Sequence, residues 1–433
     1  MRAVVLVMLC ACGRLGFDDR VDVVEPRGTV SIVAASHFIA PTTGPLVGAI
    51  VWSTTPEGAL DDVTATDEAG QAVVEVDRGG SVSTYDQSSL WVTTFVEVEP
   101  GDVLQIGVPF PLCSQATTGT VTLDWMPPAG ATRFETLVGC QTQQATIPPL
   151  AVPVDASVRE PFDVVLRAYD GDALVASATK RGVAFHDGIT HAFASAEWMP
   201  GIERTIGLRG VSIADAQLSA LLSTADASLP NADLVTSVAT GTDTVSVTKV
   251  VPADATRMTI AALGGRTEGN EETATVFLRV DVPLGISTVV PAPAPPIGAT
   301  WDAATGTVAW TLSSTTAMDS FDALVGFLDA TETLTLVWSV RTPPDARAVT
   351  FPVLPPGVMI DLTATTAPEY YLLSNNFEEA QSYRQARQLG EGFEGLFASL
   401  GFPFPAKHSG AFSLRTSQPV TARRVPAMRR NRP

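Results

Sequence analysis

The chain has 433 residues with a formal net charge of −19, and 45% of them are hydrophobic while only 17% are charged. This length exceeds one ordinary domain of about 100–200 residues, so we expect roughly two to four domains. The apolar content excludes a mainly disordered chain. The negative charge disfavours nucleic acid as a partner.

Residues 1–12 have the layout of a bacterial export signal. Arg2 precedes an apolar run from Ala3 to Leu9, and small residues follow. The end of this segment, Leu9-Cys10-Ala11-Cys12, resembles a bacterial lipobox, in which the last cysteine is acylated and becomes the first mature residue. The resemblance implies that Cys12 carries lipid and that the partner is a membrane, and Gly13 after it favours the outer membrane by analogy with sorting rules. The alternatives are a plain signal peptide and a buried strand. A transmembrane helix is excluded, because a span needs about 20 apolar residues.

A polar segment at residues 13–27 predicts a short tether, and strand patterns begin at residue 28. Alternating apolar runs and the turn motif Thr66-Asp67-Glu68-Ala69-Gly70 follow, and Glu99-Pro100-Gly101-Asp102 predicts a turn between two further strands. Over residues 28–108 this order resembles the carboxypeptidase regulatory-like (transthyretin-like) family. The resemblance implies a β-sandwich that serves as a non-catalytic accessory module, without the catalytic zinc ligands of carboxypeptidases.

Four acidic residues gather on adjacent turns of this first domain: Asp61, Asp62, Asp67 and Glu68. Loop carboxylates of extracellular β-sandwiches can bind Ca²⁺ weakly. The spacing matches no familiar calcium loop, so a solvated acidic loop is our preferred interpretation. We therefore expect no metal centre and no cofactor, and treat the four residues as weak calcium candidates.

A strand–turn–strand pattern then recurs three times, at residues 120–133, 244–257 and 333–347. Each copy is an alternating strand, a proline-initiated turn and another apolar strand, as expected where a chain crosses from one sheet of a sandwich to the other. We predict three further β-sandwich units, at residues 109–204, 205–291 and 292–415. Independent convergence on a common turn is the alternative to true repeats. The hairpin from Trp301 to Trp310 resembles a fibronectin-like first hairpin, which implies immunoglobulin- or fibronectin-like units.

Outside the leader the chain has two cysteines, Cys113 and Cys140. An even pair in an exported protein predicts a disulfide, and two buried thiols are the alternative. A zinc site is improbable because the chain's other potential ligands lack the required spacing.

The C-terminal region predicts one helix, at residues 377–389, that ends before Gly390. Arg384 and Arg387 suit its last turn. At the end of the chain, residues 416–433 are predicted to form a basic disordered tail. A contact between the tail and anionic lipid, lipopolysaccharide or the chain's own acidic domains is the alternative.

The sequence is poor in catalytic patterns, with four histidines and no nucleophile elbow or zinc-protease motif. We therefore predict an all-β chain of tandem antiparallel β-sandwich domains that is not an enzyme. Its expected role is that of a lipid-anchored cell-envelope protein with an unknown ligand, located in the outer membrane. One alternative is an accessory lipoprotein that binds an envelope protein or polysaccharide. It predicts a cluster of exposed aromatic side chains on one β-sandwich. Another is a cryptic carboxylate-dependent hydrolase with a concave pocket.

Overall fold

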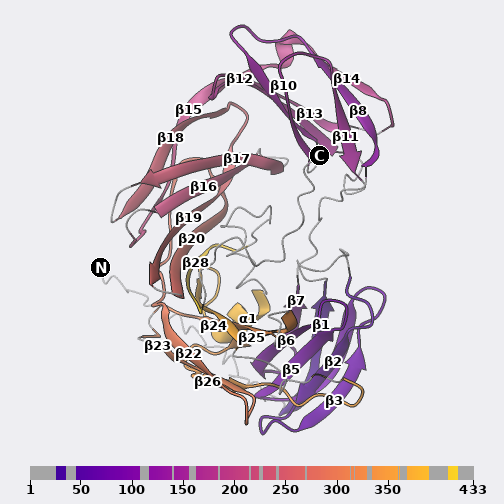
Figure 1. The fold of residues 1–433 in the computed structure, drawn as a ribbon, viewed down its shortest axis with the longest axis vertical. Helices are drawn as coiled ribbons and strands as arrows, with labels where there is room; N and C mark the ends of the chain where they lie inside the picture. Colours follow the sequence, from indigo (N-terminus) through magenta and orange to yellow (C-terminus); the bar gives the residue numbers. More distant parts are fainter. Residues whose placement is uncertain are drawn as a thin grey trace, which may run out of the picture.

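The computed structural model describes residues 26–35, 45–107, 117–138, 141–155, 162–183, 186–213, 216–223, 228–239, 243–268, 271–312, 314–315, 317–328, 334–358, 360, 368–389 and 408–417. Within these ranges the chain forms β-strands, one α-helix and one short 3-10 helix (Figure 1). The predicted fold class, all-β with antiparallel sheets and a short helix near the C-terminus, is confirmed.

A single sheet of 12 strands runs through much of the molecule. Its neighbouring strands are antiparallel except β25 and β6, where residues Val337–Arg341 run parallel to residues Trp91–Phe95. In sheet order the strands are β17 (Ser228–Ala239), β16 (Ala216–Ser223), β19 (Arg257–Glu268), β20 (Glu271–Pro283), β28 (Gly410–Thr416), β27 (Glu369–Phe377), β24 (Ser320–Leu328), β25 (Leu334–Thr342), β6 (Trp91–Val98), β5 (Gly80–Asp86), β2 (Ile50–Thr54) and β3 (Leu60–Ala65).

Shorter sheets pack against this long sheet and enclose an apolar core in each unit, and the core of the fourth unit also contains Trp52, Tyr85 and Val92 of the first. In the first unit, β4 (Gln71–Asp77), β1 (Arg27–Ala34) and β7 (Val103–Ile106) cover β2, β5 and β6. In the third unit, β15 (Met199–Arg209), β18 (Thr244–Pro252) and β21 (Ile286–Thr288) cover β16, β19 and β20. In the fourth unit, β22 (Pro296–Asp302), β23 (Thr307–Leu312) and β26 (Ala348–Thr350) cover β24, β25 and β27.

The second unit has a core of its own and lies at the opposite end of the molecule from the first unit (Figure 1). One of its sheets contains β11 (Leu150–Asp155), β8 (Thr117–Trp125) and β14 (Thr190–Phe193). The other contains β10 (Gln141–Ala145), β9 (Arg133–Val138), β12 (Phe162–Asp170) and β13 (Ala173–Val183), and it continues into β15 and β18 of the third unit. The short 3-10 helix, η1 (Ser195–Glu197), leads from the second unit to β15. The predicted domain boundaries stay predictions, because the sheets run from one unit into the next.

Strand patterns explain which face each sheet buries. In β4 the residues alternate between exposed and buried, as in a sheet with one face in water. In β24 nearly every residue is buried. One face of β24 packs into the core of the fourth unit. On its other face Leu324 is buried beside Trp91 and Val337 of neighbouring strands, so the sequence of β24 does not alternate between apolar and polar residues.

The three predicted strand–turn–strand patterns all cross between sheets. They link β8 to β9, β18 to β19, and β25 to β26, and each pair of strands belongs to two different sheets. Each turn closes with the same hydrogen bond, in which the N–H of an alanine reaches the carbonyl oxygen of the initiating proline. The three pairs are Ala131 to Pro128 at 3.3 Å, Ala255 to Pro252 at 3.1 Å and Ala346 to Pro343 at 3.2 Å.

The predicted helix at residues 377–389 is wrong in its first half. The helix α1 spans Tyr383–Leu389, whereas Phe377 is the last residue of β27. The strand forms because β24 on one side and β28 on the other offer a full set of backbone partners to residues 369–377. Phe377 is therefore held in the strand, and Glu378 and Glu379 form hydrogen bonds with Ser409 instead of starting the helix. The predicted tail also begins too early, since Thr416 ends β28; residues 418–433 lie outside the described residues.

Candidate functional site

The turn between β6 and β7 buries a carboxylate. Glu99-Pro100-Gly101-Asp102 places proline and glycine where a type II turn needs them, and Gly101 has a positive φ of 84°. The N–H of Asp102 donates to the Glu99 carbonyl at 3.1 Å, and the N–H of Glu99 donates to Asp102 Oδ2 at 2.9 Å. The Asp102 side chain is 0% exposed, so its charge needs partners within the protein.

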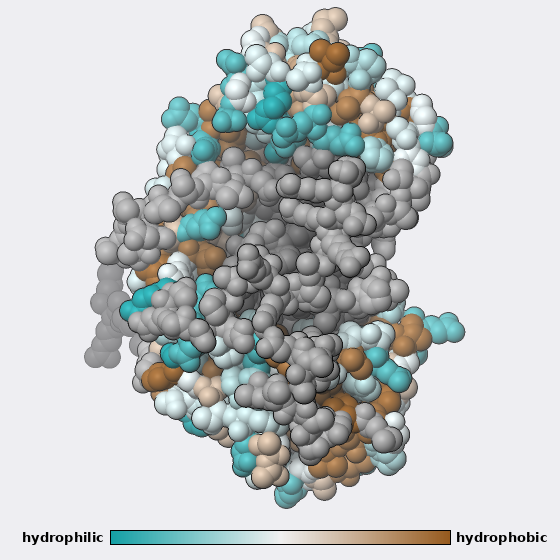
Figure 2. Space-filling model, viewed as in Figure 1, coloured by the Kyte–Doolittle hydropathy of each residue, from teal (hydrophilic) through white to brown (hydrophobic). Residues whose placement is uncertain are grey.

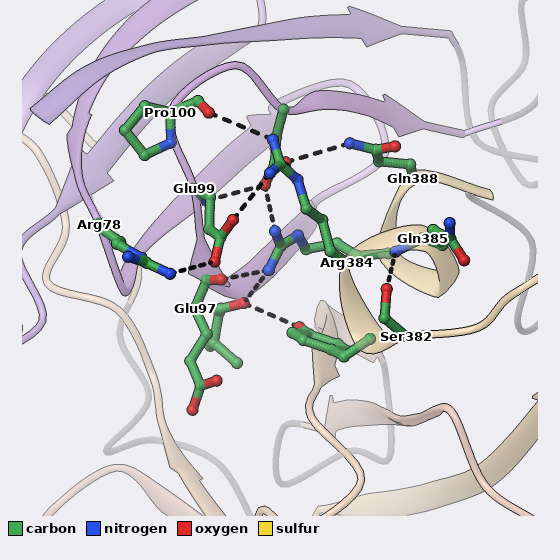
Figure 3. A network of polar contacts seen from close by, with 12 residues as sticks. Arg78, Glu97, Glu99, Pro100, Ser382, Arg384, Gln385 and Gln388 are labelled. Atoms are coloured by element: carbon green, nitrogen blue, oxygen red, sulfur yellow. Dashed lines mark hydrogen bonds and ion pairs between the residues drawn. The ribbon is translucent and has the colours of Figure 1, made fainter. Parts of the chain in front are cut away.

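A β-bulge just before this turn exposes two backbone carbonyls. Phe95 pairs with Val82 and Val98 pairs with Gly80, so Val96 and Glu97 together oppose one residue of β5. Glu97 adopts a positive φ of 52°. The bulge leaves the carbonyls of Val96 and Glu97 free of strand pairing, and in Figure 3 the Glu97 side chain points away from α1.

Helix α1 supplies the cations and donors that this buried corner requires (Figure 3). Arg384 Nε lies 2.8 Å from Asp102 Oδ1, and Gln388 Nε2 donates to the same oxygen at 3.2 Å. Arg387 donates to Asp102 Oδ2 and to the Glu97 carbonyl, and its side chain is 1% exposed. The spacing of these three residues places them on neighbouring turns of one helix face.

Glu99 extends the network toward the surface. Arg384 Nη1 lies 3.0 Å from Glu99 Oε2, and Arg78 Nη2 donates to Glu99 Oε1 at 3.4 Å (Figure 3). Arg384 is 45% exposed, so its ion pairs are more strongly screened by water than those of Arg387.

A second buried ion pair lies on the fourth unit's side of α1. Arg341 of β25 binds Asp322 of β24 through two parallel hydrogen bonds of 2.7 and 2.8 Å. Arg341 Nη1 also donates to the Ala386 carbonyl of α1 at 3.1 Å. The hydroxyl of Tyr383 lies 2.9 Å from the Val96 carbonyl and 3.0 Å from the Arg341 carbonyl, so it touches both units. Burial raises the pKa of the Tyr383 phenol far above its ordinary value, which keeps it protonated as a donor.

We call this set of contacts the clasp; its side chains are Asp102, Asp322, Arg341, Tyr383, Arg384, Arg387 and Gln388. It joins a turn of the first unit to α1 and to two strands of the fourth unit. Removing one partner of a buried ion pair is costly because the other charge stays buried. Its two buried carboxylates, Asp102 and Asp322, are engaged by arginines. The arrangement can therefore hold two units in one orientation.

The four predicted acidic residues take part in turns and pairing instead. Asp61 pairs with Arg27 at 3.0 Å, and Asp62 Oδ2 accepts the N–H of Glu75 at 2.9 Å. Asp67 Oδ1 accepts the N–H groups of Ala69 and Gln71, and Glu68 is exposed. Among the described residues no group of three or more His, Cys, Asp or Glu side chains is placed to hold a metal ion.

Three predicted sites lie outside the described residues: Cys12, Cys113 and Cys140. Acylation of Cys12 and the Cys113–Cys140 disulfide therefore stay predictions. None of the helices in the described ranges is long and apolar enough to cross a membrane.

Among the residues whose burial the structure defines, the exposed large hydrophobic ones are aliphatic or methionine. Half of them belong to the first unit: Val33, Val47, Val63, Val73, Leu90 and Val103. Where the structure defines burial, no Trp, Tyr or Phe is exposed, and Trp198 and Trp301 are half-buried. On the face in Figure 2 hydrophobic residues are concentrated at the lower end, where Figure 1 places the first unit.

Sequence reasoning missed the clasp, although two of its signals were visible. The turn at residues 99–102 and the arginines of α1 were both recognised as local features. Their contact could not be foreseen, because 285 positions separate Arg387 from Asp102.

No family model and no curated protein matches the chain. Solved structures with some similarity include the Bacillus anthracis TIE protein, at 11% identity over 62% of this chain and 51% of that one, with a TM-score of 0.15. Another is the pilus adhesin SpaC from Lactobacillus rhamnosus GG, at 10% identity over 57% of this chain and 39% of that one, with a TM-score of 0.12. The chain thus spans about half the length of the first protein and less of the second. At these TM-scores we infer neither fold nor function from them.

Proposed function

We propose that the chain is a non-enzymatic cell-envelope protein that presents its β-sandwich units from a rigid body for binding or structural roles. The observation that carries the proposal is the joint between the first and fourth units, where a continuous sheet and the buried clasp hold two cores together. A protein that displays surfaces at a distance from an anchor benefits from such rigidity, since less motion is lost on binding.

The predicted leader supplies the location. We propose that Cys12 is acylated and that the lipid holds the protein at the outer membrane, with the Cys113–Cys140 disulfide stabilising the second unit. The resemblance of residues 28–108 to carboxypeptidase regulatory-like domains supports an accessory rather than a catalytic role. The pairing of Asp102 and Asp322 with arginines also favours this role over that of a carboxylate-dependent hydrolase.

The exposed surface favours a protein over a polysaccharide as ligand. Polysaccharide-binding surfaces commonly use exposed aromatic rings, whereas the exposed large apolar residues in the described part of the first unit are valines and one leucine. Exposed aliphatic patches are more typical of protein–protein contact.

Metabolic labelling with a clickable fatty acid tests the anchor. Wild-type protein should incorporate the label and sediment with outer membranes, whereas the Cys12→Ser variant should do neither. Cys10→Ser is the matched control and should label normally. Recovery of unlabelled wild-type protein with its leader intact from the cytosol would overturn the proposal.

A further inference from the structure

The strand β28 occupies a central position although it comes from near the end of the chain. It lies between β20 and β27, and it is antiparallel to both. Its residues pair with Glu272–Leu278 on one side and with Tyr371–Phe377 on the other. In the described part of the long sheet, β28 is the strand that connects the third unit's portion to the fourth unit's portion.

The side chains of β28 fit a defined apolar seat. Ala411, Phe412 and Leu414 are at most 2% exposed. The ring of Phe412 meets that of Phe377 edge to face, with 5.5 Å between the centroids. Without β28, this seat and the backbone edges of β20 and β27 would face water, which strongly favours refilling by a strand.

Polar contacts along β28 make the seat specific for this sequence. Ser413 Oγ donates to the Pro293 carbonyl at 2.6 Å, in the segment that links the third and fourth units. Arg415 pairs with Glu271, and Ser409 Oγ accepts the N–H of Val280 at 3.1 Å. These partners are all far from β28 in sequence, so tertiary contacts determine where the strand lies.

The chain before β28 is long enough to reach beyond its own molecule. Twenty residues, 390–409, separate the end of α1 from the start of β28. Fully extended, such a segment spans at most about 70 Å. Closure within one chain corresponds to an effective concentration of roughly millimolar for a short linker, so exchange should increase as the protein concentration approaches that value.

We propose that the slot between β20 and β27 is a strand-acceptor site that β28 of a second copy can fill. Two copies would then exchange their C-terminal strands, each completing the other's long sheet by β-augmentation. The occupant is this chain's own strand, because the apolar seat and the contacts at Pro293 and Glu271 match its sequence. This proposal does not depend on the membrane anchor or on the proposed envelope role.

Cysteine pairs placed across the register test the exchange. Thr275 lies opposite Ser413, with 3.4 Å between their hydroxyl oxygens. A Thr275→Cys chain and a Ser413→Cys chain are unfolded together in urea, refolded by dilution and oxidised. We expect an intermolecular link between positions 275 and 413, identified by mass spectrometry in the dimer fraction, that increases with protein concentration.

Two controls define the result. The double variant Thr275→Cys/Ser413→Cys should form the link within one chain. A mixture of Thr275→Cys with Thr416→Cys chains, whose positions are out of register, should form little. If the single-chain link forms but the matched mixture gives no more linkage than the mismatched one at any concentration, the proposal fails.

A peptide experiment covers the case in which the cysteine chains do not refold. A fluorescein-labelled peptide of residues 408–417 is titrated against the full chain carrying Phe412→Asp and Leu414→Asp, purified directly from expression. These changes should empty the slot, so the peptide should bind saturably, and a scrambled peptide of the same composition should not. Equal binding of both peptides, or of neither, would contradict the proposal.

Discussion

The joint between the first and fourth units differs in kind from the joint between the second and third. At the first joint five residues of β6 pair with β25, the buried Arg387–Asp102 pair links α1 to the first unit, and Trp52, Tyr85 and Val92 of the first unit pack into the core of the fourth. At the second joint β13 and β15 share two residue pairs, Ala176 with Pro200 and Ser177 with Met199. Leu137 and Val165 of the second unit add apolar contacts to the core of the third.

Both joints contain apolar contacts, so what distinguishes the first joint is its buried polar network. Buried ion pairs demand defined distances and angles, so they specify one orientation of the units at little net gain in stability. Apolar contact is non-directional, so it stabilises an interface without fixing its angle. We therefore expect the first and fourth units to unfold together and the second unit to unfold separately.

The largest expected effect comes from breaking the clasp. Asp102→Asn leaves Arg387 buried without a full counter-charge, so the free energy of unfolding should fall by about 3–5 kcal/mol. Urea denaturation followed by tryptophan fluorescence measures the loss. The matched control is Asp281→Asn, in an exposed pair with Arg257, which should cost about 0–1 kcal/mol.

A double-mutant cycle separates the ion pair from general damage. Combining Asp102→Asn with Arg387→Met removes both charges, so the combined loss should be smaller than the sum of the single losses by about 0.5–3 kcal/mol. If the losses in unfolding free energy are strictly additive, Asp102 and Arg387 do not act as a pair. The buried ion pair would then not be what distinguishes the first joint from the second.

The second joint should respond to a cavity. Leu137 is 1% exposed and packs into the core of the third unit, so Leu137→Ala should cost about 2–5 kcal/mol. Calorimetry should show the transition of the second unit moving to lower temperature while that of the first and fourth units stays in place. A single transition that shifts as a whole would show that the second unit is coupled as tightly as the others.

The smallest expected effect is on the pH dependence of stability, which should differ between the second unit and the other units. Burial lowers the pKa of His191 in β14 from its ordinary value of 6.5, and Lys180 adds to the shift. The unfolded chain therefore takes up the proton at a higher pH than the folded chain does, so the free energy of unfolding falls as the pH drops through 6.5. His191→Gln should reduce this loss, and it should do so only in the transition of the second unit. An identical pH dependence in wild type and variant would remove His191 as the cause.

Local chemistry made several features predictable. The proline turns at Pro128, Pro252 and Pro343 followed from sequence because proline presets the backbone angle of its own residue. The turn at Glu99–Asp102 was recognised for the same kind of reason. By contrast, residues 377–382 were assigned to a helix, because the sequence does not reveal that Phe377 ends β27 or that Glu378 and Glu379 bind Ser409 beside β28.

The sequence by itself determined the all-β class, the crossover turns and the short helix near the C-terminus, since periodicity and turn chemistry act over a few residues. Only the tertiary structure decided that β28 enters the middle of the long sheet and that Asp102 receives Arg384 and Arg387. Those contacts join residues hundreds of positions apart, and which distant strands and charges meet depends on how whole cores pack rather than on any local pattern.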